Sequence, residues 1–422
     1  MKNIYDSVFQ TFKSSADLGM GLLTTDKQGL SSNYFTINKK KYLNFCLNDY
    51  LGLTQDKRVK QGAIDAIKKH GAYSSVSKVF IKIDKYQEAE EQLSNMFGKP
   101  CLLFSRTTIA HTGILPVIIN SDDAILVDHH AHASIKLATD SLKVNGISVE
   151  VIKHNHIGII EDKIKELSIK YKKIWYLADS VYSMFGDSFP FVDLMALIKK
   201  YPQFHLYIDD SHGISWTGEN GRGFAPDKIG YHPQITLITS LGKGFGAGGG
   251  VAVFYDERTK LRCEVCAPPL TFSSPIAPPT LGAIIASAKI HLTNEIYTRQ
   301  ADLREKIQYF IELAHELQVP IIGDTYSPVF LFPGSTPEIT NEINYGLLKR
   351  SIYMCVTHFP AVPANNSGIR IMICNYHTKE NIQTLLYALR DELDKALDKR
   401  KLGKNDIIRF YKIQPENAEI FK

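Results

Sequence analysis

The sequence predicts an α/β protein with a large, doubly wound parallel sheet and a smaller α+β region toward its C-terminal end. Between residues 101 and 254, seven short apolar runs recur, and each is continuously apolar, as in strands covered on both faces. Patterns typical of helices stand between several runs, as parallel crossovers require. In such sheets ligands bind beyond the C-terminal ends of the strands, so polar residues after each run are candidate site residues.

The predicted elements of the sheet follow one another along the chain. The strands are expected at CLLFS (101–105), AILVD (124–128), VEVI (149–152), IWYL (174–177), HLYID (205–209), ITLIT (235–239) and GVAVF (250–254). The crossover helices are expected at about 133–143, 159–171 and 192–201.

Further elements are predicted on either side of the sheet. Helical patterns occur at 57–70, 85–97, about 279–317, about 340–351 and about 378–400, and the strand-like runs PVFLF and IRIMIC lie between the last of these. The proline-rich stretch PPLTFSSPIAPPT (268–280) marks a boundary. We therefore predict an N-terminal segment (1–55), a large α/β domain (56–290) and a small α+β domain (291–422).

The composition is that of an ordinary folded protein of two or three domains. Of 422 residues, 44% are hydrophobic and 22% are charged. The net charge of +5 is spread along the chain, and this pattern does not favour nucleic acid as a partner. No window approaches the roughly 18 consecutive apolar residues of a membrane helix, and the N-terminal stretch lacks the apolar core of a signal peptide. We therefore expect a cytoplasmic protein without a membrane span.

The six cysteines are scattered through the chain, mostly inside apolar runs. This pattern predicts reduced, buried thiols and not a disulfide framework. Cys263 and Cys266 have the spacing of a CxxC pair but no second pair to complete a zinc site, so we expect no metal there.

Three strand ends carry candidate catalytic residues. HLYI is followed by Asp209, and His212 lies three residues later, although a carboxylate at a strand end can also be a simple helix cap. ITLIT is followed by Lys243, which lies among glycines at the end of a buried sheet, and a buried amine is the group that forms Schiff bases. AILVD is followed by three histidines, His129, His130 and His132, which cannot all face one metal ion. Stacking of an imidazole on a planar cofactor is therefore a better interpretation of this cluster than a metal site.

These residues belong to a longer series of motifs that resembles one family. The segments are NDYLGL (48–53), HASI (132–135), DSVYSMFGD (179–187), IDDSHGISWTGENGRG (208–223), SLGKGFGAGGG (240–250), FSSPIAPP (272–279) and SGIRIMICNYH (367–377). They resemble the α-oxoamine synthases, which are fold-type I pyridoxal-phosphate enzymes, and they run in family order through nearly the whole chain. The resemblance implies a seven-stranded, mostly parallel sheet in the large domain and bound pyridoxal 5'-phosphate.

The resemblance also implies roles for the catalytic residues. Lys243 would bind the cofactor as a Schiff base and later move the Cα proton of the substrate. Asp209 would pair with the pyridine nitrogen, which makes the ring an electron sink. His132 would stack on the ring, and His212 would hydrogen-bond its phenolic oxygen.

Further positions match the parts of the family's site that bind phosphate and substrate. Ser240 replaces the usual threonine at the phosphate, and Ser274 would donate to the phosphate of the neighbouring subunit, which implies a homodimer. Asp179 and Ser183 lie in the segment beneath the cofactor. Arg370 would clamp the carboxylate of the amino acid, a task suited to a planar bidentate donor, and Asn48 would help to shape the substrate site.

Two segments depart from the family pattern. A glycine-rich stretch is replaced by residues 71–78, so that Tyr73 and Lys78 would occupy space left to backbone and acyl substrate. The segment that binds phosphate through N–H groups at a helix start reads SRTTIA (105–110), where the candidate donors are Ser105, Thr107 and Thr108 and the added charge is Arg106.

The expected reaction joins an amino acid to an acyl thioester, carried on coenzyme A or acyl carrier protein, usually with decarboxylation, to give an α-amino ketone. Two alternatives stay open. One is another reaction on the same cofactor, such as transamination or retro-aldol cleavage, which the altered glycine segment would favour. The other is a non-catalytic subunit, although such subunits tend to lose the lysine that this chain keeps as Lys243.

Overall fold

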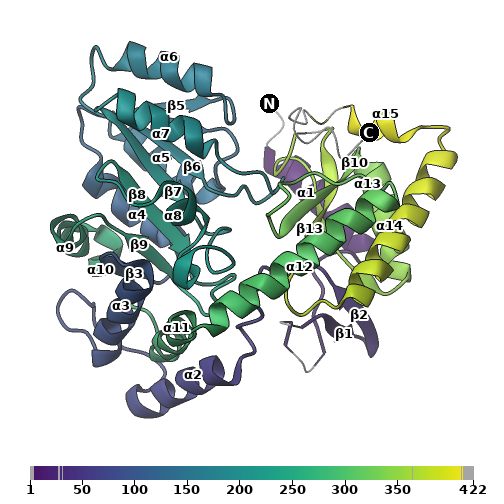
Figure 1. Cartoon of the computed structure of the whole chain (residues 1–422), viewed down its shortest axis with the longest axis horizontal. Helices are drawn as coiled ribbons and strands as arrows, with labels where there is room; N and C mark the ends of the chain where they lie inside the picture. Colours follow the sequence, from purple (N-terminus) through teal and green to yellow (C-terminus); the bar gives the residue numbers. More distant parts are fainter. Residues whose placement is uncertain (1–3, 27–28, 31, 364, 410, 412–422) are drawn as a thin grey trace. The chain divides into compact units, whose positions relative to one another are not determined.

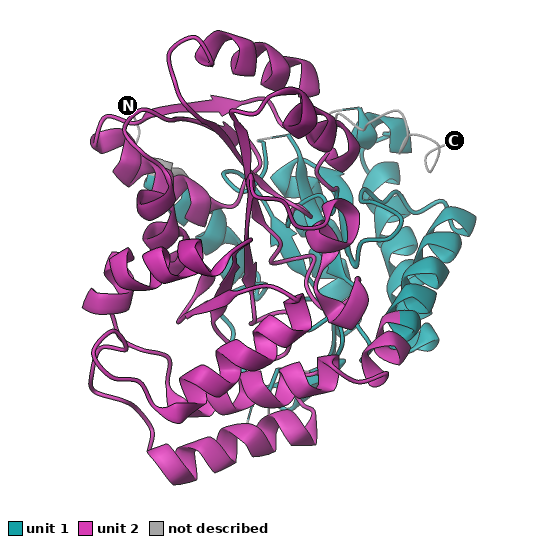
Figure 2. Cartoon of the chain, turned by 60° about the vertical axis from the view of Figure 1, so that its left-hand side comes forward, with its two compact units in different colours: residues 1–52, 183–187, 301–422 teal, residues 53–182, 188–300 magenta. Residues whose placement is uncertain are grey.

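The structure is a computed structural model that describes residues 4–26, 29–30, 32–363, 365–409 and 411. The chain forms two compact units, which Figure 2 shows in different colours. Unit 1 consists of Met1–Gly52, Ser183–Asp187 and Ala301–Lys422, and unit 2 consists of Leu53–Tyr182 and Ser188–Gln300. These units are groups of residues in contact, and they do not test the predicted division into three domains. That division remains a prediction.

Unit 2 contains a seven-stranded sheet with the strand order β3-β9-β8-β7-β6-β4-β5 (Figure 1). Its strands are β3 (Cys101–Phe104), β4 (Ala124–Asp128), β5 (Ser148–Ile152), β6 (Ile174–Asp179), β7 (Phe204–Asp209), β8 (Ile235–Ser240) and β9 (Gly250–Val253). All neighbouring pairs are parallel except those made by β9, which runs antiparallel to both β8 and β3. The predicted seven-stranded, mostly parallel sheet is confirmed.

The register of the sheet brings the predicted site residues to one edge. Asp179 at the end of β6 is the direct partner of Asp209 at the end of β7. Ser240 ends the neighbouring strand β8. Because the C-terminal ends of parallel strands meet at the same edge, the two carboxylates and this hydroxyl lie on adjacent strands.

Helices cover the sheet and fill the rest of unit 2. They are α2 (Lys57–His70), α3 (Asp84–Phe97), α4 (Thr107–Ile118), α5 (Ala133–Val144), α6 (Ile157–Leu167), α7 (Phe191–Lys200), α8 (Phe224–Ile229), α9 (Glu257–Cys266), α10 (Pro268–Phe272) and α11 (Pro278–His291). Along the part of the chain that the structure describes, no helix combines the length and the apolarity needed to cross a membrane.

The single helix predicted from about residue 279 to 317 is in fact two helices, α11 and α12 (Glu295–Glu316). Thr293 lies at the break, where its hydroxyl donates to the carbonyl of Ile290 at 2.8 Å and accepts from the N–H of Glu295 at 3.4 Å. This short side chain thereby satisfies backbone groups at the end of one helix and at the start of the next. The boundary between the two units falls inside α12, after Gln300.

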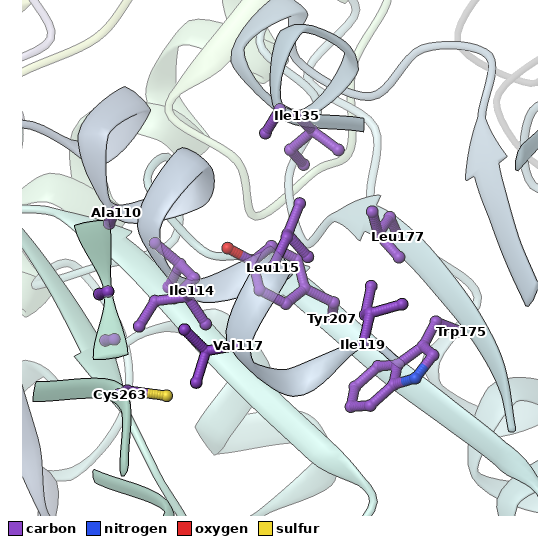
Figure 3. Packing of buried hydrophobic residues seen from close by; sticks show 14 of the residues in the cluster. Ala110, Ile114, Leu115, Val117, Ile119, Ile135, Trp175, Leu177, Tyr207 and Cys263 are labelled. Atoms are coloured by element: carbon purple, nitrogen blue, oxygen red, sulfur yellow. The ribbon is translucent and has the colours of Figure 1, made fainter. Parts of the chain in front are cut away.

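The core of unit 2 lies against the face of the sheet that α4 and α5 cover (Figure 3). Leu115 of α4, Ile135 of α5, Leu177 of β6 and Tyr207 of β7 are all fully buried there. Strand β5 is the exception to the predicted two-sided burial, because it forms the edge of the sheet and leaves Val151 58% exposed.

Unit 1 contains two small sheets. In one, β1 (Tyr34–Ile37), β2 (Lys40–Asn44) and β11 (Ile352–Tyr353) lie side by side, with β2 parallel to β11. In the other, β13 (Ser367–Met372) lies between β10 (Val329–Ser335) and β12 (Cys355–Thr357). The remaining helices of this unit are α1 (Ile4–Asp17), α13 (Pro337–Lys349), α14 (Lys379–Asp398) and α15 (Lys404–Ile408). The N-terminal segment therefore shares a sheet with the C-terminal region.

Candidate active site

The lysine predicted to bind the cofactor lies in the link between β8 and β9. The N–H of Gly246 donates to the carbonyl of Lys243 at 2.9 Å, which closes a tight turn. Gly246 has a φ of 75°, and a Cβ at this position would collide with Leu53. Only glycine fits this turn without strain, and the turn fixes the backbone from which the Lys243 side chain extends.

The Lys243 side chain lines a cavity of about 370 Å³ at the C-terminal edge of the sheet. Ligand pockets in proteins begin at about this size. The predicted cofactor residues that line this cavity are Thr107, Thr108, His132, Asp179, Asp209, His212, Ser240 and Lys243, and they are joined by Arg106, Ile109, Ser134, Val181 and Ser211. The structure thus brings together the residues that the sequence placed at separate strand ends.

The pKa values of the two paired carboxylates in this cavity are shifted in opposite directions. Burial raises the pKa of Asp179 well above its usual range, and the negative charge of Asp209 adds to this shift. Burial alone would also raise the pKa of Asp209, but the hydrogen bond from His111 and the charge of Lys243 lower it below its usual range. The surroundings of the two carboxylates therefore favour the ionised form of Asp209 and the protonated form of Asp179.

His111 is a site residue that the sequence analysis missed. It lies on the second turn of α4, is fully buried, and has its Nε2 atom 3.0 Å from Oδ2 of Asp209. The other oxygen of Asp209 accepts from the N–H of Ser211 at 2.9 Å. The available signal was a lone histidine in the apolar stretch IAHTGILPVI, since a buried imidazole needs a polar partner.

Asp210, which follows Asp209 in the chain, has a structural role. Its side chain is fully buried and accepts hydrogen bonds from the hydroxyl of Ser180 and from the N–H of Ala225 at 3.2 Å. Burial raises its pKa to about 8, so this carboxyl is mainly protonated at neutral pH. The negative charge at the end of β7 therefore belongs to Asp209.

His132 is positioned by the start of α5. As the residue before the helix, it accepts from the N–H of Ser134 through Nδ1, and the Ser134 hydroxyl lies 2.7 Å from the same nitrogen. The imidazole is exposed and lines the cavity, as stacking on a planar ligand requires. The neighbouring His130 instead stacks on His154, with ring centroids 4.0 Å apart.

The N-terminus of α4 provides a site for an anion. Arg106 is the residue before the helix, and its side chain forms no capping hydrogen bond. The side chain of Arg106 therefore does not occupy the backbone N–H groups of the first helical turn. Thr107 and Thr108, in the first turn, line the cavity together with Ser240. A helix start of this kind binds phosphate through its N–H groups and its dipole. A lysine amine, an ionised carboxylate and a phosphate site in one cavity fit pyridoxal phosphate.

Three of the predicted cofactor residues lie outside this cavity. Ser105 and Ser274 line a separate small cavity with Lys78, and Ser274 is exposed. Ser183 belongs to unit 1. Lys78, from the segment that departs from the family, is buried and has its Nζ 3.2 Å from a carboxylate oxygen of Glu90, whereas Tyr73 is 45% exposed.

The two predicted substrate residues meet within unit 1. Nη2 of Arg370, on β13, donates to Oδ1 of Asn48 at 3.2 Å, and the hydroxyl of Tyr50 lies 3.4 Å from the same oxygen. The Nε atom of Arg370 is buried and has no hydrogen-bond partner among the described residues. An unsatisfied buried guanidinium nitrogen suits a carboxylate ligand, which can accept two bonds from one arginine.

Comparison with known proteins identifies the family. The family model of the aminotransferases of class I and II matches residues 40–389. The 8-amino-7-oxononanoate synthase of Thermosipho melanesiensis is 30% identical over 375 residues, which are 88% of this chain and 90% of that protein. The enzyme of the same name from Petrotoga mobilis is 28% identical, over 96% of this chain and 99% of its own length.

Solved structures agree in fold. Serine palmitoyltransferase of Sphingomonas wittichii has a TM-score of 0.84 at 20% identity and covers 93% of this chain and 98% of its own. The 8-amino-7-oxononanoate synthase of Francisella tularensis has a TM-score of 0.69 at 22% identity, over 84% of this chain and 98% of its own.

The fold and the cavity define a pyridoxal-phosphate-dependent enzyme of fold type I. More narrowly, the chain belongs to the aminotransferase class I and II family and, within it, to the α-oxoamine synthases, which are pyridoxal-phosphate-dependent acyltransferases.

Proposed function

We propose that this protein condenses an amino acid with an acyl thioester, carried on coenzyme A or acyl carrier protein, and releases the carrier thiol, usually together with carbon dioxide, to give an α-amino ketone. The observation that carries this proposal is the cavity in which Lys243 and Asp209 lie together with an α4 N-terminus for phosphate. It is supported by relatives named as synthases of 8-amino-7-oxononanoate over most of the chain.

The cavity residues divide the chemistry among them. Pyridoxal phosphate, when bound, supplies a conjugated ring that accepts the electron pair of the Cα carbon. Lys243 would hold the cofactor through its amine and, once that amine is free, would accept the Cα proton. Asp209 would pair with the protonated ring nitrogen, His132 would stack on the ring and His212 would bond its phenolic oxygen. Ser240, Thr107 and Thr108 would bind the phosphate.

The amino acid is held through its carboxylate. Arg370 binds this group with its planar guanidinium, and Asn48 orients the guanidinium through the bond from Nη2. The buried Nε atom of Arg370, which no described residue satisfies, supports this assignment.

The working unit is a homodimer in the cytoplasm. One part of the surface of unit 2, named here the Phe80 surface, gathers exposed apolar side chains from the loop before α3 and from α9 and α10: Val76, Val79, Phe80, Ile81, Leu261, Val265 and Phe272. Ser77 donates to the carbonyl of Leu270, and Lys82 pairs with Glu264, so the loop lies against these helices. Such a patch is typical of a protein interface, and the exposed Ser274, which the resemblance assigns to the neighbour's phosphate, is close to it in the chain.

Absorbance titration tests the reaction. Purified protein loaded with pyridoxal phosphate is titrated with single amino acids, each with and without short and long acyl-coenzyme A. One amino acid is expected to shift the absorbance band of the lysine-bound cofactor, and carbon dioxide is expected only when a thioester is also present. Lys243→Ala should lose the band and the turnover but keep its circular dichroism, whereas Arg370→Lys should keep the band and raise the KM for the amino acid.

Two results would contradict the proposal. Formation of a keto acid from the amino acid without any thioester would identify transamination instead. No absorbance band after addition of pyridoxal phosphate to the wild type would mean that the chain is a non-catalytic subunit.

A further inference from the structure

A chain of hydrogen bonds runs behind the candidate cofactor cavity, from β7 through α4 and back to the end of β7. The hydroxyl of Tyr207 lies 2.8 Å from Nδ1 of His111, and Nε2 of His111 lies 3.0 Å from Oδ2 of Asp209. Tyr207 and His111 are fully buried, and Asp209 is 4% exposed. Tyr207 belongs to the packed cluster that Figure 3 shows, so the chain is held by the core of unit 2.

The direction of these bonds follows from their surroundings. Burial and the nearby charge of Asp209 raise the pKa of Tyr207 well above its usual range, so its hydroxyl keeps its proton. An ionised carboxylate only accepts hydrogen bonds, so Nε2 of His111 carries a proton and donates to Asp209. The hydroxyl of Tyr207 bonds Nδ1 on the other side of the ring and thereby orients the imidazole.

The same contacts determine how Asp209 can face a ligand. Oδ2 accepts from His111, and Oδ1 accepts from the N–H of Ser211 at 2.9 Å. Bonds to both oxygens prevent rotation of the carboxylate, and a carboxylate oxygen can accept more than one hydrogen bond. One lone pair of Asp209 can thus be directed at the ring nitrogen, while the raised pKa of Asp179 on the neighbouring strand disfavours a second negative charge there.

We propose that His111 is a positioning residue that, with its imidazole oriented by Tyr207, holds the Asp209 carboxylate for the protonated ring nitrogen of the cofactor. The inference deepens the proposed function and depends on its cofactor assignment. His111 itself does not contact the reacting atoms. It acts through Asp209, so its removal should weaken only those properties that need the ring nitrogen.

A pair of ligands separates this role from a general structural one. The apoprotein is titrated with pyridoxal phosphate and with its 1-deaza analogue, in which a C–H group replaces the ring nitrogen, and the dissociation constants are measured by fluorescence. In His111→Phe we expect the dissociation constant for pyridoxal phosphate to rise about tenfold, as for loss of a hydrogen bond to a charged group, and that for the analogue to stay within about twofold.

Two further variants test the chain itself. His111→Gln places an amide N–H near the position of Nε2 and should restore most of the affinity for pyridoxal phosphate. Tyr207→Phe removes the hydroxyl that orients the imidazole and should produce part of the loss seen in His111→Phe. Both variants keep the test decisive if His111→Phe does not fold.

His205→Phe is the matched control. His205 is another buried histidine of unit 2 and lies near the start of β7, at the opposite end of the strand from Asp209. Its substitution should leave the ratio of the two dissociation constants unchanged. The inference is overturned if the folded His111 and Tyr207 variants weaken both ligands equally, or neither. A wild-type protein that binds no pyridoxal phosphate would instead overturn the proposed function.

Discussion

Asp179 and Asp209 are chemically identical side chains at equivalent positions on neighbouring strands, yet the pKa of Asp179 is raised and that of Asp209 is lowered. The difference comes from their partners. Asp209 accepts from His111 and Ser211, whereas Asp179 accepts from the N–H of His132, at 3.1 Å. Two negative charges on directly paired strand residues would repel each other, so the carboxylate with the stronger bonds favours the charge and its neighbour favours the proton.

This asymmetry predicts unequal effects of the same substitution. Asp209→Asn removes the charge that we propose for the ring nitrogen and should lower kcat by about 10²-fold or more, as for loss of a preorganised charge in an active site. Asp179→Asn puts a neutral amide of the same shape in place of a carboxyl whose pKa is raised, and should lower kcat by less than tenfold. Steady-state kinetics on both variants, with cofactor content measured by absorbance, is the test, and equal losses would contradict the assignment.

His377 predicts a pH dependence of stability. The N–H of Cys374 donates to its Nδ1 at 3.2 Å, so Nε2 carries the proton and donates to the carbonyl of Asn44 at 2.8 Å. The ring also stacks on Phe45, with centroids 4.0 Å apart. Burial, with the charge of Lys306, lowers its pKa to about 4, although the bond to Asn44 opposes this shift.

Between its folded pKa and the unfolded value of about 6.5, the unfolded chain binds more protons at this residue, so the free energy of unfolding falls as the pH falls from 6.5 to 4. One such histidine contributes a slope of about 1.4 kcal/mol per pH unit. In His377→Gln the slope should be smaller by this amount, and urea denaturation between pH 4 and pH 7 measures it. An unchanged slope would show that the pKa of His377 is not lowered in the folded protein.

At the scale of elements, helix α4 acts on the candidate cofactor cavity at two points. Its first turn lines the cavity with Thr107 and Thr108, and one turn later His111 bonds Asp209, which also lines it. Thr107 and His111 are four residues apart and so lie on the same face of the helix. Ile114 and Leu115, three and four residues after His111, continue this face and pack into the core, which fixes both functional groups relative to the sheet.

The sheet and most of the cavity could be predicted from the sequence, because seven buried strands leave continuous apolar runs and their C-terminal ends meet at one edge. The break at Thr293 could not, since one side chain that satisfies two helix ends leaves the apolar pattern of α11 and α12 nearly continuous. The role of His111 was hidden for a different reason. Its partners, Tyr207 and Asp209, are 96 and 98 residues away in the chain.

Close packing of helices α2 and α11 predicts a second effect on stability. A Cβ added at Gly62 of α2 would lie 2.5 Å from the carbonyl oxygen of Gly282 on α11 and 2.9 Å from the Cβ of Ala286. Gly62→Ala must therefore push the two helices apart and should lower the free energy of unfolding by about 1–3 kcal/mol.

The control for this substitution is Gly158→Ala in α6. A Cβ at Gly158 has its nearest neighbour at 3.5 Å, an ordinary contact with His156. Because alanine favours a helix over glycine, this variant should be as stable as the wild type or more stable by up to about 1 kcal/mol. Urea denaturation measures the stability of both alanine variants. If the two are equally stable, the close approach of α2 and α11 is not the reason why residue 62 is a glycine.

At the scale of the whole molecule, unit 1 is assembled from three separate stretches of chain. The sequence predicted an N-terminal segment without saying where it would pack. Strand β2 lies parallel to β11, with Leu43 opposite Ile352. No pattern within residues 1–55 encodes that partner, because both strands are short and their pairing depends on residues about 300 positions apart.

The Phe80 surface predicts the oligomeric state. Phe80 is 79% exposed and Phe272 is 86% exposed in the single chain, and we expect a second copy to cover both. Phe80→Glu should therefore shift the protein from dimer toward monomer in analytical ultracentrifugation. Ile169→Glu is the control, because Ile169 is 89% exposed but lies outside this surface, and it should leave the dimer intact. A wild-type monomer, or a dimer unaffected by Phe80→Glu, would contradict this assignment.

The pairing of β2 with β11 also has a consequence during synthesis on the ribosome. The hairpin of β1 and β2 emerges first but has no third strand until the chain reaches Tyr353, roughly 300 residues later, which takes about 15–60 s at ~5–20 residues per second. A two-stranded hairpin is only marginally stable by itself. All of unit 2 is made in the meantime. The N-terminal strands therefore wait long for their partner, and they are the segment on which we expect a chaperone to act.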